Sequence, residues 1–234
     1  MAVDATLLNS ALTHSLCSVR FYRWETPTVS LGHFQDVASL RKTPRLASLP
    51  VVRRLSGGGA IVHHHELTYS CAVPKDHALA AEPRQIYNLV HQRIIACLKE
   101  LGIATRLRGT QISEKAGAFL CFGRGDDFDV VIGDVKVLGS AQRRRKGAIL
   151  QHGSLILKRS EYAPDFPGLS DLSNLEILAT DLQRVLPEAV GRLFATTVVP
   201  SELNLAEEAD TKRLEPEFRV QDLPRQEPPD EAPS

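Results

Sequence analysis

Short runs of strand character, separated by turns rich in glycine and proline, dominate this sequence and limit what it can fold into. The runs carry β-branched and aromatic residues and are too short to be typical helices. They cover residues 18–24, 28–32, 50–55, 60–63, 67–73, 128–132, 135–140 and 148–157. Gly133-Asp134 predicts a tight hairpin between the runs on either side of it. The chain is therefore expected to build its core around a sheet.

Helical patterns are fewer and do not alternate strictly with the strands. Apolar residues recur at helical spacing in residues 2–16 and 86–101, and Pro83 suits the first turn of the second segment. Residues 181–194 predict another helix, which Pro187 is expected to interrupt or start. This order of elements predicts an α+β (mixed α/β) fold, in which a mixed, largely antiparallel sheet is flanked by helices.

The composition fits a soluble protein with a core and argues against two other classes. Hydrophobic residues make up 43% of the 234 residues, and charged residues make up 24%. The 28 basic and 28 acidic side chains cancel, whereas a nucleic-acid binder usually carries a basic excess. No apolar run approaches the roughly 18 residues of a membrane span, and the first residues lack the pattern of a signal peptide. We therefore expect a cytoplasmic protein that binds neither nucleic acid nor membrane.

The composition changes near residue 206. Pro, Glu, Asp, Arg and Gln dominate the remainder, and aromatic residues nearly vanish. Such a segment buries too little apolar surface to offset the entropy that is lost on ordering. The sequence therefore predicts a folded domain over residues 1–205 and a charged, proline-rich, disordered tail over residues 206–234.

Ser56-Gly57-Gly58-Gly59 separates two of the predicted strands and follows the pair Arg53-Arg54. Three glycines free the backbone for positive φ angles and for the close approach of a ligand, whose anion or carbonyl the backbone N–H groups can face. A flexible hairpin explains a bare glycine run equally well. The pattern matches neither a P-loop nor a dinucleotide-binding fingerprint.

Three reactive side chains have less distinctive surroundings. Lys136 follows the predicted hairpin and precedes Gly139-Ser140-Ala141, so it could project into a cleft, although a solvated lysine is the more ordinary explanation. His152 alone is more often a structural histidine. Cys121 precedes Lys136 by fifteen positions. A thiol beside an ammonium group has a lowered pKa and can carry an acyl group as a thioester, but spacing alone leaves that pairing open.

The other cysteines and two charged or polar runs have simpler interpretations. Cys17, Cys71 and Cys97 lie far apart without metal-ligand spacing, which indicates small buried side chains rather than disulfides. His63-His64-His65 cannot all bind one ion if adjacent strand residues point to opposite faces, so no metal is expected. Arg143-Arg144-Arg145-Lys146 predicts a solvated turn or a docking surface for an acidic carrier protein.

Taken in order, these motifs resemble the biotin/lipoate protein ligase (BPL/LPL) superfamily. The matching segments are R-R-x-S-G-G-G-A-x-x-H from Arg53, E-L-T-Y-S from Glu66, C-F at Cys121, K-V-x-G-S-A-Q-R-R from Lys136 and L-Q-H-G-S from Leu150. Residues 20–24 and 30–35 are similar to the opening strands of the family. The resemblance extends from Met1 to about residue 200. It implies the catalytic-domain fold of that superfamily for residues 1–205.

Within the superfamily, residues 66–70, 121–122 and 142–155 resemble the cysteine-dependent octanoyltransferases. The resemblance implies that octanoyl passes from octanoyl-acyl carrier protein to a lysine of apo lipoyl-domain proteins, such as the glycine cleavage H protein or 2-oxoacid dehydrogenase E2. It makes Cys121 the nucleophile that forms a thioester and Lys136 the general acid/base, without a cofactor. The substrate-binding residues that it implies are Arg54, Gly57, Gly58, Gly59, His63, Gly139, Ser140, Ala141, His152 and Gly153.

Two other functions remain open at this point. An ATP-dependent lipoate-protein ligase, which would need ATP and magnesium, is the main alternative, because the glycine run and Lys136 would also serve an acyl-adenylate. A non-catalytic module that binds carrier proteins is the third, and the presence of both Cys121 and Lys136 argues against it. The sequence departs from the family at His64, where an acidic residue is usual, and at residues 123–127, where a proline-containing stretch is usual.

Overall fold

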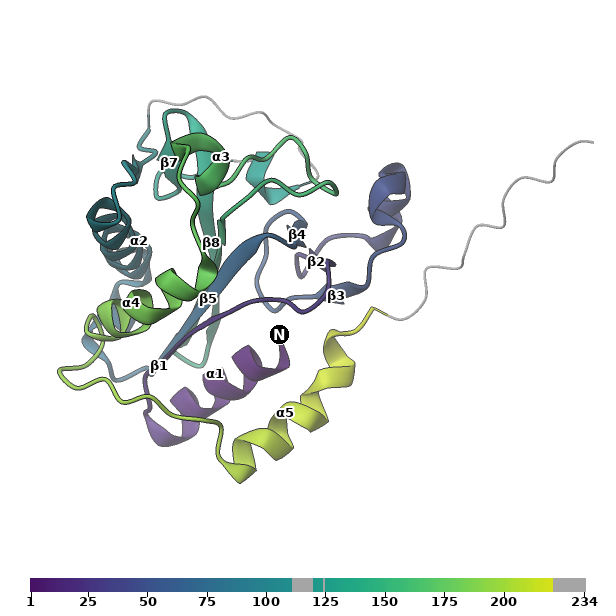
Figure 1. Ribbon diagram of the computed structural model, residues 1–234. Coiled ribbons are helices and arrows are strands. Elements are labelled where there is room, and N and C mark those ends of the chain that lie inside the picture. The colour runs from purple at the N-terminus through teal and green to yellow at the C-terminus, as the bar shows by residue number, and fades with distance from the viewer. Residues whose placement is uncertain (111–119, 124, 221–234) are drawn as a thin grey trace, which may run out of the picture.

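A six-stranded antiparallel sheet, ordered β1-β5-β9-β8-β7-β6, forms the centre of the molecule (Figure 1). The computed structural model describes residues 1–110, 120–123 and 125–220, without the side chains of Ser39, Arg41, Lys42 and Cys121. The strands of the sheet are β1 (Ser18–Tyr22), β5 (Glu66–Val73), β6 (Arg106–Leu107), β7 (Val130–Ile132), β8 (Val135–Arg145) and β9 (Ala148–Ile156).

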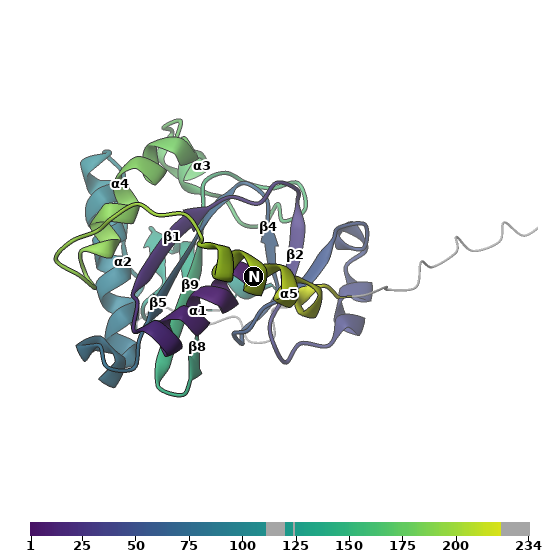
Figure 2. The same cartoon turned by 90° about the horizontal axis from the view of Figure 1, so that it is seen from below.

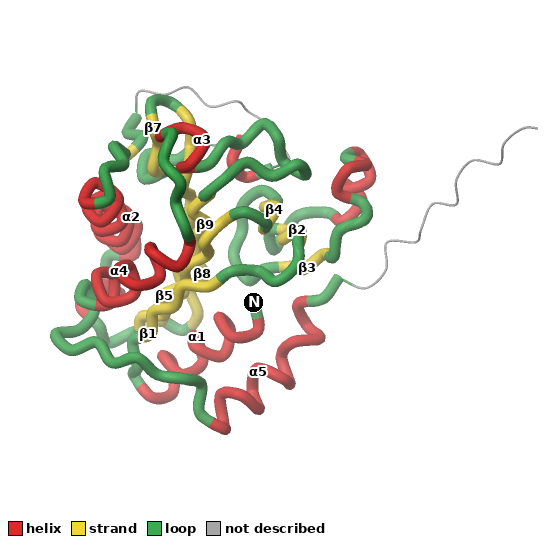
Figure 3. The backbone as a smooth tube through the Cα atoms, viewed as in Figure 1, coloured by secondary structure: helices red, strands yellow, loops and turns green. Residues whose placement is uncertain are grey.

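A second, three-stranded sheet lies beside the first and has the order β3-β2-β4. Its strands are β2 (Thr28–Leu31), β3 (Val51–Arg53) and β4 (Ile61–His63), with β2 parallel to β3 and antiparallel to β4. Figure 3 shows both sheets, with loops connecting them. The small sheet has an apolar cluster of its own, which includes Leu31 and Leu40. The predicted mixed, largely antiparallel architecture is confirmed.

Helices cover both faces of the large sheet. Helices α2 (Pro83–Glu100) and α4 (Ala179–Gly191) pack on one face, and α1 (Ala2–His14) packs on the other (Figures 1 and 2). The short α3 (Leu169–Ser173) adds to the first layer. Short 3-10 helices occur at η1 (Val37–Lys42), η2 (Pro44–Leu46), η3 (Ala78–Ala81) and η4 (Cys121–Gly123). Among the described residues, no helix is both long enough and apolar enough to cross a membrane.

The alternation of side chains along β5 explains why the two faces of the sheet differ. Leu67, Tyr69 and Cys71 point into the apolar core beneath α2 and α4. Thr68 and Ser70 alternate with them and therefore point to the opposite face. That second face packs on α1 through an apolar cluster that includes Leu8 and Ala72, and through the hydrogen bond of Ser70 to Asp4. Its polar part carries the site described below.

Two helices differ from their predictions. Helix α4 runs through Pro187 without interruption, because Leu182, Leu186 and Val190 recur at helical spacing and bury fully in the core. Residues 205–218 form α5 (Leu205–Phe218) instead of the predicted disordered tail.

Helix α5 is stabilised at both of its ends. At the first turn, Asn204 and Glu207 form a reciprocal capping box. At the other end, Leu214 and Phe218 bury against residues of α1, including Ala5. The disorder predicted for residues 206–218 is therefore wrong, and the part of the predicted tail at 221–234 lies outside the described residues.

Candidate active site

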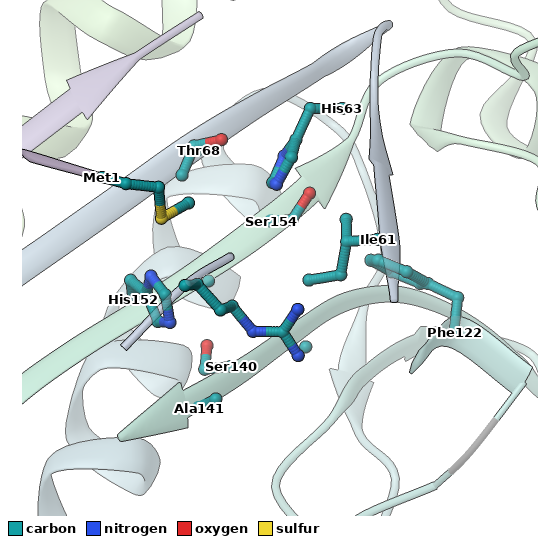
Figure 4. A pocket seen from close by; sticks show the side chains of 12 residues that line it. Met1, Ile61, His63, Thr68, Phe122, Ser140, Ala141, His152 and Ser154 are labelled. Atoms are coloured by element: carbon teal, nitrogen blue, oxygen red, sulfur yellow. The ribbon is translucent and has the colours of Figure 1, made fainter. Parts of the chain in front are cut away.

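A pocket lies where the small sheet meets the polar face of the large one (Figure 4). Both sheets contribute to its lining, together with the segment that follows residue 120. The lining residues are Met1, Arg54, Ile61, His63, Thr68, Phe122, Gly139, Ser140, Ala141, His152, Gly153 and Ser154. The wall thus combines apolar side chains with a few polar groups, as is typical of small-molecule sites.

Arg54 is buried next to the glycine turn and hydrogen bonds to its backbone. Its side chain is only 1% exposed. Its guanidinium donates to the carbonyl of Ser30 at 3.0 Å and to the carbonyls of Gly57 and Gly59 at 2.8 and 2.7 Å. Gly58, between those two carbonyls, has φ 96°, which disfavours any residue with a Cβ. Arg54 therefore fixes the shape of the turn at the edge of the pocket.

His63 is oriented by a buried carboxylate. Its Nδ1 lies 2.6 Å from Oε1 of Glu66, and Trp24 stacks on the imidazole with ring centroids 4.2 Å apart. Because Nδ1 is paired with Glu66, Nε2 is the ring nitrogen that remains for other partners. Nε2 is buried and has no hydrogen-bond partner among the described residues, and His63 faces the pocket (Figure 4). A ring nitrogen without a partner thus belongs to a side chain that lines the pocket.

His152 is a neutral imidazole on the opposite wall. Ser56 hydrogen bonds to its Nε2, and its Nδ1 lies 3.9 Å from Oδ2 of Asp4. Asp4, which comes from α1, accepts hydrogen bonds from Arg20 at 3.0 Å and from Ser70 at 2.8 Å. Burial lowers the pKa of His152 to about 4, against the opposing effect of Asp4. His152 is therefore uncharged at neutral pH.

Lys136 folds back over its own strand to reach a second buried carboxylate. Its Nζ lies 2.9 Å from Oδ2 of Asp129 and 5.3 Å from the centroid of the Phe122 ring. The lysine and aspartate side chains are 7% and 3% exposed. A Cβ at Gly139 would lie 2.4 Å from Cε of Lys136, so only glycine leaves room for this path. Burial raises the pKa of Asp129, and the neighbouring Lys136 opposes that effect.

Ser140 belongs to a directed chain of hydrogen bonds beneath the sheet. The Nδ1 of His91 donates to the carbonyl of Phe128 at 2.5 Å, so its Nε2 accepts from Ser140 Oγ at 2.6 Å. Tyr69 donates in turn to Ser140 at 2.7 Å, and Gln151 donates to Tyr69 at 2.7 Å. Burial lowers the pKa of His91 to about 4, which keeps it neutral. The Ser140 hydroxyl thus donates one hydrogen bond and accepts another, and these two bonds fix its position at the pocket.

The backbone of Cys121 lies next to this pocket, and its side chain is outside the described residues. Cys121 begins η4, and the following residue, Phe122, lines the pocket and contacts Lys136. The preceding residue, Leu120, pairs in a parallel bridge with Ala60, directly after the glycine turn. The chain thus brings Cys121, Lys136 and the glycine turn into one neighbourhood.

The structure also assembles the residues that were expected to bind substrate. Those that line the pocket are Arg54, His63, Gly139, Ser140, Ala141, His152 and Gly153, and Gly57, Gly58 and Gly59 form the turn that Arg54 holds. Four further residues were missed in the sequence: Asp4, Glu66, His91 and Asp129. A carboxylate three positions after a histidine could have indicated Glu66, whereas the others depend on contacts between distant segments.

Comparisons with known proteins identify the family of the chain. Residues 1–164 match the model of the lipoyl protein ligase A/B catalytic domain. An octanoyltransferase LipM of Moorella thermoacetica is 30% identical and aligns over 95% of this chain and 91% of the relative. A second LipM, of Halalkalibacterium halodurans, is 28% identical over 92% and 89%.

Solved structures show the same fold. A T. acidophilum protein assigned as a lipoate protein ligase, with bound lipoic acid, has a TM-score of 0.65 at 20% identity, covering 92% of this chain and 88% of that one. Lipoate-protein ligase A bound with ATP has a TM-score of 0.61 at 21% identity, covering 91% and 87%. On the match of its family model and of these relatives, the chain belongs to the lipoyl protein ligase A/B catalytic-domain family.

Proposed function

We propose that this protein is an octanoyltransferase that moves octanoyl from octanoyl-acyl carrier protein to a lysine of apo lipoyl-domain proteins through a thioester on Cys121. The observation that supports the proposal is the buried Lys136–Asp129 pair, because its Nζ lies over the ring of Phe122, the pocket residue that directly follows Cys121 in the chain. The relatives that align over most of the chain and are named octanoyltransferase support the same reaction.

The first half-reaction loads the enzyme. The Cys121 thiol gives its proton to the Lys136 amine, and the resulting thiolate attacks the carbonyl of the octanoyl thioester. The bond between the carbonyl carbon and the carrier's sulfur breaks, and the carrier thiolate leaves with the proton returned by Lys136. Asp129 holds Nζ in place and stabilises the ammonium form that exists between these two transfers.

The second half-reaction releases the acyl group onto the acceptor. The lysine amine of the lipoyl domain attacks the Cys121 thioester, the carbon–sulfur bond breaks, and an amide forms. The attacking nitrogen loses a proton, and the cysteine sulfur gains one. In this proposal the lone pair on Nε2 of His63, fixed by Glu66, accepts the hydrogen bond of the incoming amine. No cofactor takes part, and a reducing cytoplasm suits a thiol that must stay reduced.

Intact-protein mass spectrometry tests the thioester. The chain mixed with octanoyl-carrier protein should gain one octanoyl group, which hydroxylamine removes. Cys121→Ala should stay folded, gain nothing and transfer nothing. Cys17→Ala, which removes a half-buried thiol outside the pocket, should load like the parent.

The same assay separates the proposal from its alternative. A second reaction contains free lipoate, ATP, magnesium and an apo lipoyl domain. The proposal predicts no product there. If Cys121→Ala kept full activity, and that activity required ATP and free lipoate, a lipoate-protein ligase would replace the transferase.

A further inference from the structure

Two histidines and a glutamate meet on the outer side of the small sheet, and the transfer reaction uses none of them. His64 and His65 form the bend between β4 and β5, and Glu161 lies in the loop after β9. The nearest ligand atoms of the three side chains all lie within 4.8 Å of one another. Alternation along a strand would separate adjacent histidines, but these two occupy a bend, where alternation does not apply.

His64 is held in place before any ligand binds. Its Nδ1 lies 3.0 Å from Oγ of Ser160, a hydroxyl in a residue that is only 7% exposed. Tyr162 meets the ring edge-on at 5.6 Å, and the His65 ring stacks on it at 3.6 Å. Hydrogen bonds of this kind to the second ring nitrogen orient the histidine ligands of metal ions.

We propose that His64, His65 and Glu161 bind a zinc ion, with three protein ligands and an open fourth position. Two imidazole nitrogens and one carboxylate oxygen are a ligand set that zinc accepts in tetrahedral sites. Zinc–ligand distances of about 2.0–2.2 Å place neighbouring ligand atoms roughly 3.4 Å apart. Each separation must therefore shrink by at most about 1.4 Å, a movement that exposed side chains such as His65 and Glu161 achieve by rotation.

Some neighbouring charges favour a cation at this position and others oppose it. Partial burial lowers the pKa of His65, and His64, Lys158 and Arg23 lower it further, while Glu161 raises it. Lys158 and Arg23 repel a cation, and the Glu161 carboxylate offsets part of that repulsion.

Zinc at this position would join two separate walls of one cavity. His65 and Ser160 line that cavity together with Ile61 and Phe122, which also line the active-site pocket. The ion would therefore tie the β4–β5 bend to the loop after β9. We expect it to raise the melting temperature of the chain, because a ligand that binds the folded state stabilises it.

Calorimetric titration of the metal-free full chain with zinc sulfate tests the site. One zinc should bind per chain, and His64→Gln and Glu161→Gln should each weaken its affinity tenfold or more. Circular dichroism confirms that the variants stay folded, as expected for partly or fully exposed residues. His33→Gln, which removes an exposed histidine from another loop, should bind zinc like the parent.

Cobalt substitution identifies the ligands independently. Cobalt in the proposed site should show the visible absorption of a four-coordinate ion without a thiolate charge-transfer band. A thiolate band, zinc affinity within twofold of the parent in both variants, or no saturable binding would each overturn the proposal.

Discussion

Two imidazoles at the pocket are neutral because they are buried. The free energy of unfolding should therefore decrease as the pH falls. Burial lowers the pKa of both His91 and His152 to about 4, from about 6.5 in an unfolded chain. Below pH 6.5 the unfolded state binds these protons and the folded state does not. The stability contributed by each histidine is therefore complete above pH 6.5 and is lost as the pH falls towards 4.

The size of this loss follows from the two pKa values. Between pH 7.5 and pH 5.0, a pKa displaced from 6.5 to 4 lowers the free energy of unfolding by about 2 kcal/mol. The two histidines together therefore remove about 4 kcal/mol. The His152→Gln variant keeps an amide beside Ser56 and removes one titration, so it should lose about 2 kcal/mol less than the parent over the same range.

Urea unfolding at pH 7.5 and pH 5.0 measures this difference. Comparing the pH effect between parent and variant cancels contributions of other groups, including Asp129, whose raised pKa acts in the opposite direction. The exposed-histidine variant His33→Gln should keep the full pH effect of the parent. An unchanged pH effect in His152→Gln would refute the conclusion that His152 is buried in the neutral form.

Three further substitutions, two of them with a matched control, test the proposed chemistry and the fold. Asp129→Asn should lower the rate of acyl loading at least tenfold, measured by intact mass over time. Asp134→Asn, which changes an exposed aspartate two positions before the same lysine in the sequence, should load normally. His63→Gln should still load octanoyl but should transfer it to the acceptor more slowly, and equal slowing of both half-reactions would contradict its assigned step. Phe218→Ala should lower the free energy of unfolding by about 3 kcal/mol, and Leu205→Ala, at an exposed position of the same helix, should change it little.

Local signals predicted most of the sheet but not the full length of its strands. The Gly133-Asp134 hairpin was visible because turn chemistry is local. The β8 strand was expected to end at Ser140, yet it continues to Arg145. Its pairing with β9 supplies the hydrogen bonds of those last residues, and neither strand shows that pairing in its own sequence.

Site residues that belong to a sequence motif could be predicted. Residues whose role depends on a contact with a distant segment of the chain could not. Lys136 and His152 stood in recognisable motifs. No motif in the sequence singles out Asp4, which lies in the first turn of α1, and only the packing of α1 on the sheet shows that it is buried. The α5 helix was missed because the prediction used the average composition of residues 206–234. The packing of α5 on α1 depends instead on a few apolar residues such as Leu214 and Phe218.

The contact between α1 and α5 also determines how late in synthesis the fold can be completed. Thr6 bonds to Thr211 across 205 positions, and Ser10 bonds to Glu207 across 197. A ribosome that adds about 5–20 residues per second needs on the order of 10–40 s to make the chain between them. Throughout that interval the α5-facing side of α1, which includes Ala2 and Ala5, has no partner. A nascent chain that stalls before residue 218 therefore presents an apolar surface to chaperones at its first helix.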